Sequence, residues 1–210
     1  MTNTPLASAA VDIGAVQTIR KLRMLLAIAT VGTLFVFGAA RWSERVHEMI
    51  EWAGLVLMFI CIGGRCWCAL YIGGRKNHEL VTTGPYSITR NPLYLFSIVG
   101  AVGVGAQFGG ISVALLAGLF VTIIHLLVVR QEERLLLALH GEIYRQYVAE
   151  VPRFLPDFLR WNDVDVIEVQ PRAVVTTFLD ACLFLASVPI AESLEYFQQL
   201  GYIHVFLRLP

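Results

Sequence analysis

Long apolar runs dominate this chain and restrict the folds that it can adopt. Residues 24–40, 49–72, 93–106 and 111–129 are almost entirely apolar, and residues 173–190 form a fifth such run. About 20 apolar residues span a bilayer as a helix, and a helix satisfies its own backbone hydrogen bonds inside lipid. The runs therefore predict an all-α fold, an integral membrane helical bundle with four to five transmembrane helices.

The composition agrees with a membrane protein. Hydrophobic residues make up 57% of the chain and charged residues 15%, against roughly one half and one quarter in ordinary globular proteins. The formal net charge is zero, so no electrostatic feature points to nucleic acid as a partner. The lipid bilayer is the expected partner, and the sequence leaves the oligomeric state open.

The last apolar run leaves two arrangements open. Asp180 lies inside residues 173–190, and a carboxylate at the centre of a span costs about 2.5–3.5 kcal/mol on insertion. This run is therefore either a fifth span or a helix that lies on the membrane, and the amphipathic residues 191–210 have no assignment. The expected parts are an N-terminal tail at 1–23, a membrane core at 24–160, and a linker with C-terminal helices at 161–210.

Basic residues are distributed unevenly between the two sides of the expected bundle. Cytoplasmic loops of membrane proteins are enriched in Lys and Arg. A cytoplasmic N-terminus leaves only Arg41 and Arg45 on the outer side, and it brings the polar stretches 73–94 and 130–156 to the same cytoplasmic face. The basic residues on that inner side are then Arg20, Lys21, Arg23, Arg75, Lys76, Arg90, Arg130 and Arg134.

The cysteines give no sign of a metal site or a disulfide framework. Cys61, Cys66 and Cys68 lie in one apolar run, and Cys182 lies in another. They form no CxxC motif, and no histidine stands near them at zinc-binding spacing. We expect buried free thiols and no bound metal.

Three glycines inside residues 93–106 have a spacing that resembles a nucleotide-binding loop. Gly100, Gly103 and Gly105 lie in an apolar run and do not follow a strand, so the context of a dinucleotide fingerprint is missing. Small residues at such spacing let membrane helices approach closely. They predict a helix-packing face.

Two adjacent carboxylates stand where the fourth apolar run ends. Glu132 and Glu133 can bind a cationic ligand or accept protons, although an ordinary solvated helix start is equally consistent with the residues. His125 precedes Glu132 by seven residues and lies on the same helix face, where it either takes part in a site or only packs against a neighbouring helix.

The other polar stretch has a cation and two tyrosines at the start of the third run. Arg90 precedes Asn91-Pro92, and Pro92 presets the first helical turn. Tyr86 and Tyr94 suit a membrane interface, so a boundary without chemistry is an alternative to a site. Arg65 lies about two turns inside its run, where an arginine either snorkels or faces a polar cavity.

Together the two polar stretches resemble the isoprenylcysteine carboxyl methyltransferase family, within the wider group of membrane methyltransferases that includes phospholipid methyltransferases. The family pattern is close to H-x-L-V-x-x-G-x-Y-x-x-x-R-H-P-x-Y, followed by a Glu-Glu pair, a Gly-Glu-x-Tyr step and a Val-Pro element. The first part is matched by His78, Leu80, Val81, Gly84, Tyr86, Arg90, Pro92 and Tyr94. The second part is matched by Glu132, Glu133, Gly141, Glu142, Tyr144, Val151 and Pro152.

The resemblance extends over about residues 50–156 and has two departures. Arg65, Trp67 and Gly74 also resemble the helix and turn before the motif in bacterial relatives. Asn91 stands where the family has histidine, and Phe96 stands where a glycine often follows the tyrosine. An asparagine keeps hydrogen-bonding groups but cannot become a cation, so any charged role at that position is lost.

The resemblance implies a bacterial inner-membrane enzyme that uses S-adenosyl-L-methionine at the cytoplasmic edge of the bundle. It transfers a methyl group to a lipidic or membrane-delivered small-molecule acceptor. A carboxylate acceptor would need a cation such as Arg90 or Arg153, whereas an amine acceptor would need a base such as Glu132 or Glu133. The cofactor-binding residues that it implies are His78, Leu80, Val81, Gly84, Tyr86, Arg90, Asn91, Pro92, Tyr94, Glu132 and Glu133, and the catalytic residues are Arg90, Glu133 and Arg153.

Two other functions remain open on the same scaffold. One is a non-catalytic membrane protein that binds a lipid or a partner subunit, which Asn91 and the unmatched residues after Pro156 favour. The other is a membrane reductase of the steroid-reductase type, which would carry a nicotinamide cofactor in place of the methyl donor.

Overall fold

The computed structural model describes residues 38–40, 42–75, 79–205 and 207–209. The elements follow the apolar runs closely, with two short strands near the ends of the chain. In order they are β1 (Gly38–Ala40), α2 (Glu44–Ile72), α3 (Pro85–Ile88), α4 (Pro92–Ala106), α5 (Ile111–Glu150), a 3-10 helix at Phe158–Arg160, α6 (Pro171–Cys182), a 3-10 helix at Leu183–Ala186, α7 (Ser187–Gln199) and β2 (Leu207–Leu209).

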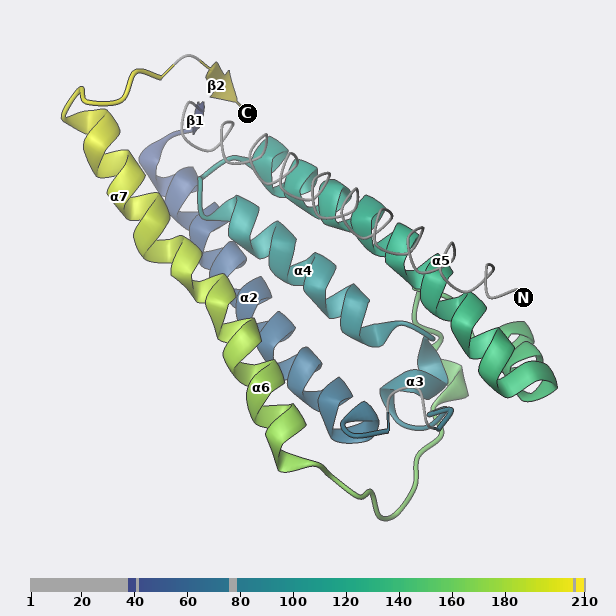
Figure 1. Ribbon diagram of the computed structural model, residues 1–210. Coiled ribbons are helices and arrows are strands. Elements are labelled where there is room, and N and C mark those ends of the chain that lie inside the picture. Colours follow the sequence, from purple (N-terminus) through teal and green to yellow (C-terminus); the bar gives the residue numbers. More distant parts are fainter. Residues whose placement is uncertain (1–37, 41, 76–78, 206, 210) are drawn as a thin grey trace, which may run out of the picture.

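The long helices lie side by side (Figure 1), with α4 between α2 and α5. Helices α6 and α7 pack along α2 in the antiparallel sense, since the Ser187 hydroxyl contacts the Met58 sulfur and Ala173 contacts Gly73. The two strands form a short parallel pair, with Gly38 opposite Leu207.

Three helical stretches are long and apolar enough to cross a membrane, namely Glu44–Ile72, Ile111–Glu150 and Pro171–Gln199. The helical character of the predicted bundle is thereby confirmed. The helical segment of the fifth run is longer than expected, because α7 continues beyond residue 190 to Gln199. Residues 24–37 of the first run lie outside the described residues. The expectation of a helix up to residue 40 is wrong at its end, because Gly38–Ala40 pair with β2.

Large apolar side chains point outward along the expected spans. Val56, Phe59 and Ile60 of α2 are exposed, as are Leu119 and Ile123 of α5. Apolar surface of this extent is unfavourable in water, whereas lipid solvates it. The outer surface of the bundle therefore agrees with a membrane setting.

Glycines bring α4 into close contact with α2. A Cβ at Gly103 would lie 2.6 Å from the carbonyl oxygen of Gly54, and a Cβ at Gly100 would lie 2.5 Å from the Cys61 sulfur. Neither position has space for a side chain. The interpretation of these glycines as a helix-packing face is confirmed.

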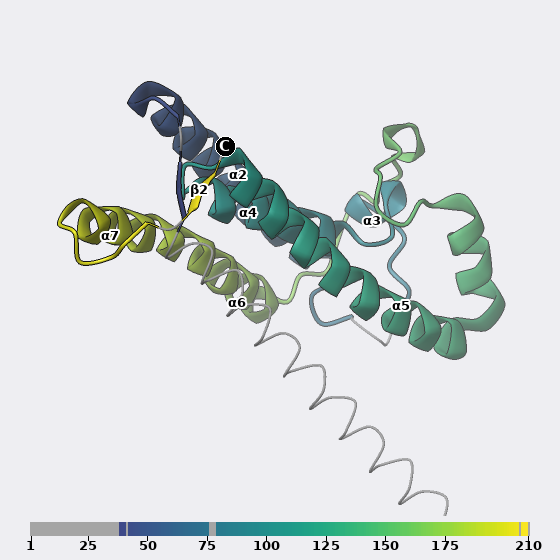
Figure 2. The same cartoon turned by 90° about the horizontal axis from the view of Figure 1, so that it is seen from above.

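Two departures from regular spanning helices shape one end of the bundle. Helix α4 has 15 residues, about 22 Å at 1.5 Å per residue, which is less than the roughly 30 Å of a hydrocarbon core. Helix α5 is kinked at Gly141, where φ is 54° and ψ is −120°. After the kink its last turns run back toward α3 (Figure 2).

Candidate functional site

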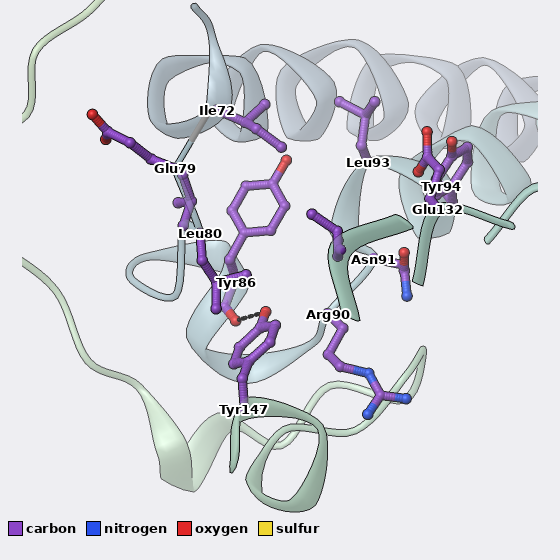
Figure 3. A pocket seen from close by; sticks show the side chains of 12 residues that line it. Ile72, Glu79, Leu80, Tyr86, Arg90, Asn91, Leu93, Tyr94, Glu132 and Tyr147 are labelled. Atoms are coloured by element: carbon purple, nitrogen blue, oxygen red, sulfur yellow. Dashed lines mark hydrogen bonds between the residues drawn. The ribbon is translucent and has the colours of Figure 1, made fainter. Parts of the chain in front are cut away.

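A pocket lies at the end of the bundle where α2 ends, α4 begins and α5 bends. Its cavity volume is about 80 Å³, and it opens to solvent at its mouth. Figure 3 shows the side chains that line it, which are Ile72, Glu79, Leu80, Val81, Tyr86, Arg90, Asn91, Leu93, Tyr94, Glu132, Leu136 and Tyr147.

The segment between α2 and α4 is held by a tight turn at Gly84. Its φ is +58°, and a Cβ there would lie 2.3 Å from the Tyr71 ring. The Gly84 amide donates to the Asn162 carbonyl at 2.8 Å. A side chain at this position would be strained and would also displace Tyr71, so glycine is required for the turn.

The part of α5 beyond the kink closes the pocket from below in the view of Figure 3. The Tyr147 hydroxyl donates to the Tyr86 carbonyl at 2.7 Å. Tyr144, Tyr147 and Val151 form a buried cluster against Leu80. The kink at Gly141 is thus what brings an otherwise distant helix end onto the first polar stretch.

Arg90 is anchored by backbone groups of the second polar stretch. Its Nη1 donates to the Val148 carbonyl at 2.8 Å, and its amide donates to the Pro152 carbonyl at 2.9 Å. Its neighbour Asn91 donates through Nδ2 to the Arg153 carbonyl at 3.2 Å. The two stretches, 60 residues apart in the sequence, are therefore joined side by side, which a shared site requires.

Glu133 lies between two arginines. It accepts from Arg153 Nε at 3.1 Å and from Arg153 Nη2 at 2.7 Å, and Arg90 Nη2 is 3.2 Å from the same carboxylate. The side chain of Arg90 is only 8% exposed and that of Glu133 14%. The hydrogen bonds to Glu133 raise the pKa of Arg153. This arrangement fixes the positions of both arginine side chains.

The two adjacent glutamates face different spaces. Glu132 lines the pocket described above. Glu133 lines a second hollow of about 360 Å³, together with Arg130, Arg134, Leu137, Tyr144, Arg145, Val148 and Arg153.

Tyr86 presents a polar atom inside the pocket. In the described part of the chain its hydroxyl is buried without a hydrogen-bond partner, and burial raises the pKa of Tyr86 well above its usual value. The hydroxyl therefore stays protonated and can donate to a ligand. A buried donor without an acceptor is unfavourable, so this atom is a specific indication that a ligand completes the pocket.

Two polar residues inside the membrane helices have partners within the bundle. Arg65 donates to the Ser97 hydroxyl across α2 and α4, so it faces the interior. The ring of His125 lies 4.7 Å from that of Tyr94, which joins α5 to the first turn of α4.

The residues predicted from the sequence fall into three groups. Leu80, Val81, Tyr86, Arg90, Asn91, Tyr94 and Glu132 line the pocket; Gly84 and Pro92 shape the backbone beside it, and Glu133 and Arg153 lie at the second hollow. His78 lies outside the described residues. Five lining residues were missed, Ile72, Glu79, Leu93, Leu136 and Tyr147.

Comparison with known proteins gives matches over most of the chain. Residues 56–143 match the model of the family described as phospholipid methyltransferase, which confirms the wider group to which the sequence motifs pointed. The chain is 31% identical over 175 residues to the cobalt-zinc-cadmium resistance protein CzcN of Cupriavidus metallidurans, with 83% of this chain and 81% of that protein covered.

A second relative is the nickel-cobalt-cadmium resistance protein NccN of Alcaligenes xylosoxydans xylosoxydans. It is 30% identical over 184 residues, which cover 87% of this chain and 86% of NccN. No solved structure matches the chain. The chain therefore belongs to the family of these two resistance proteins, and its central part, residues 56–143, matches the phospholipid methyltransferase family model.

Proposed function

We propose that this chain is an integral-membrane methyltransferase that uses S-adenosyl-L-methionine and acts on a lipidic or membrane-delivered acceptor. The observation that carries the proposal is the pocket formed by both polar stretches, which combines the carboxylate of Glu132, the buried hydroxyl of Tyr86 and apolar walls. The match of residues 56–143 to phospholipid methyltransferases supports the same reaction class. The isoprenylcysteine carboxyl methyltransferases are the related subgroup that the sequence motifs favour.

The chemistry of the pocket fits this cofactor. S-adenosyl-L-methionine, when bound, supplies a methyl group on a positively charged sulfur. Glu132 provides a negative charge for its cationic groups, the Tyr86 hydroxyl offers a hydrogen bond to a ribose or adenine acceptor, and Leu80 and Val81 provide apolar contacts. Transfer to an aligned acceptor requires mainly positioning and exclusion of water, which can contribute roughly 7–11 kcal/mol.

The side chains around the pocket suit two kinds of acceptor. Arg90 is a fixed cation at the pocket wall and can hold a carboxylate, which needs no base. An amine acceptor must lose a proton, and the Glu132 carboxylate lies on the pocket wall to receive it. Glu133 is already engaged by two arginines, so in this proposal it positions Arg90 and Arg153 and Glu132 is the base.

The names of the two relatives indicate the setting in which this activity operates. Both are named for resistance to cobalt and cadmium, one with zinc and the other with nickel. We infer that this chain also works in a metal-resistance system in a bacterial inner membrane, with its N-terminus and the pocket on the cytoplasmic side. A non-catalytic role in that system is the second candidate function, because neither name states a methyl transfer.

Calorimetric titration with S-adenosylhomocysteine tests the proposal on the full chain in detergent. We expect saturable binding at micromolar concentration and clear weakening in Glu132→Gln. The control is Glu142→Gln, a change of the same kind at an exposed glutamate that pairs with Arg145. No binding at high micromolar ligand would contradict the enzyme and favour the non-catalytic role. Native membranes incubated with labelled methyl donor would then identify the acceptor.

A further inference from the structure

Three potential metal ligands converge at the end of the bundle opposite the pocket. His47 Nε2 lies 3.2 Å from Glu51 Oε1 and 2.8 Å from Glu195 Oε1. All three ligand atoms lie within 4.8 Å of one another. His47 and Glu51 are one helical turn apart in α2 and so share a face, whereas Glu195 comes from α7.

The packing around His47 fixes the direction of its ring. Gly109, in the turn between α4 and α5, has φ +66°, and a Cβ there would lie 1.9 Å from Cε1 and Nδ1 of His47. The Nδ1–Cε1 edge of the imidazole therefore faces the turn, and Nε2 lies near the carboxylates. The Gln107 side chain donates to the Glu51 carbonyl at 2.8 Å, which ties the same turn to α2.

The His47 Nε2 atom is buried without a hydrogen bond in the described part of the chain. It lies close to one carboxylate oxygen of Glu51 and one of Glu195. A divalent cation among the three atoms would give this nitrogen and both carboxylates a shared partner.

The distances suit a small divalent ion. Zinc binds histidine nitrogen and carboxylate oxygen at about 2.0–2.2 Å, so neighbouring ligand atoms of a tetrahedral site are about 3.3 Å apart. The 3.2 Å distance from His47 to Glu51 is close to that value, and the 2.8 Å distance to Glu195 is shorter. The side chains of Glu51 and Glu195 are partly exposed, so they have freedom to adjust around an ion.

The charge of this end also favours a cation. Glu44 and Glu48 on α2 and Glu192 on α7 are exposed, and the arginines nearest to His47 in the sequence are Arg41 and Arg45. Acidic residues around a site raise the local concentration of cations.

We propose that His47, Glu51 and Glu195 form a binding site for a divalent transition-metal ion of the zinc class, with a water molecule or an external ligand in the fourth position. Imidazole and carboxylate ligands suit this class. The ion joins α2 to α7 about 35 Å along α2 from the pocket, given 1.5 Å per residue. The site is argued from these side chains alone and does not depend on the methyltransferase proposal.

Cobalt and zinc titrations test the site on the full chain, with any affinity tag removed and after treatment with a chelator. We expect one saturable Zn²⁺ site per chain by calorimetry. We also expect a visible absorption band of bound Co²⁺ that Zn²⁺ abolishes. His47→Gln and Glu195→Gln should each weaken binding by more than the roughly 10- to 100-fold that loss of an outer-shell partner costs.

Two matched controls separate the site from general charge effects. Glu48→Gln removes an exposed glutamate next to His47, and His140→Gln removes another histidine; both should keep the wild-type affinity. No saturable binding to the wild-type chain would overturn the proposal and leave His47 as an ion-pair partner of the two glutamates. Equal loss in Glu48→Gln and Glu195→Gln would also overturn it.

A stability measurement covers the case in which a variant folds poorly. Saturating Zn²⁺ should raise the melting temperature of the wild-type chain, since a ligand that binds only the folded state stabilises it. The rise should disappear in Glu51→Gln and persist in Glu48→Gln. An equal rise in all variants would contradict the site.

Discussion

The Glu133 carboxylate receives both Nε and Nη2 of Arg153, at 3.1 and 2.7 Å. This bidentate contact, together with Arg90 at 3.2 Å, makes Glu133 the centre of a charge cluster that joins α5 to both polar stretches. Removal of the charge leaves a largely buried arginine unpaired, which typically costs about 1–3 kcal/mol.

Glu133→Gln should therefore lower both stability and ligand affinity. We expect a lower melting temperature in detergent and weaker binding of S-adenosylhomocysteine. A double-mutant cycle with Arg153→Gln should give a coupling energy of about 1 kcal/mol, discounted because Arg153 is 40% exposed. Strict additivity of the two changes would show that the contact contributes nothing. Glu133→Ala should also abolish methyl transfer while the chain still folds.

Glu132→Gln should separate binding from stability. Glu132 lines the pocket, so its change should weaken binding of the methyl-donor product while the melting temperature stays close to that of wild type. The opposite pattern, a lower melting temperature with intact binding, would show that Glu132 supports the fold and not the ligand. The comparison with Glu133→Gln uses the same chemical change one residue away.

Asn91→His should raise affinity for the methyl donor. The asparagine donates through Nδ2 to the Arg153 carbonyl, and an imidazole N–H can donate the same bond while adding a group that can become cationic. Asn91→Leu removes the donor and should weaken binding. Titration of both variants with S-adenosylhomocysteine checks this; equal affinities for wild type and both variants would assign Asn91 to the scaffold.

Gly141→Ala should disturb the pocket without any steric clash. Nothing lies within 4 Å of a Cβ at this position, but φ 54° with ψ −120° is a region that only glycine adopts readily, and such strain costs about 1–3 kcal/mol. We expect weaker product binding and lower stability. Gly63→Ala, an exposed helical glycine that is also free of contacts, should leave both unchanged.

Gly64→Ala should be destabilising because of one neighbour. A Cβ there would lie 2.2 Å from the Phe96 ring, and overpacking of this kind costs about 1–3 kcal/mol. A second change, Phe96→Leu, should be less destabilising in the Gly64→Ala background than in wild type. Melting temperatures of the four chains check this; additive effects would contradict the direct contact.

The apolar runs predicted the helices well because lipid imposes a simple rule on length and polarity. They could not predict the strand at Gly38–Ala40, since its partner, Leu207–Leu209, is far away in the sequence. The end of α7 was also missed, because Gln198 and Gln199 continue the helix after the apolar pattern fades.

The sequence predicted most of the residues of the site but not how they are arranged. The sequence showed that Glu132 and Glu133 are adjacent, but neighbours on a helix point about 100° apart, and only packing decides which of them faces a cavity. Phe96 departs from the family pattern, in which a glycine often follows the tyrosine. The structure explains this departure, because the large ring occupies the space that Gly64 leaves open in α2. The sequence around Phe96 alone could not show this pairing. The proposed metal ligands do not follow a zinc spacing in the sequence, since Glu195 approaches His47 only through the antiparallel packing of α7 on α2.

The short α4 makes bilayer thickness a determinant of access to the pocket. Its 15 residues start at the pocket and are too few for a typical membrane, so lipid must thin beside it or headgroups must descend toward Tyr94. The neighbouring α5 continues well past that level and bears Glu132. In the proposed enzyme, an amphiphilic acceptor would enter the pocket laterally from the leaflet and a water-soluble donor would enter from the cytoplasm. Thicker bilayers should then slow entry of the acceptor and leave binding of the donor unchanged.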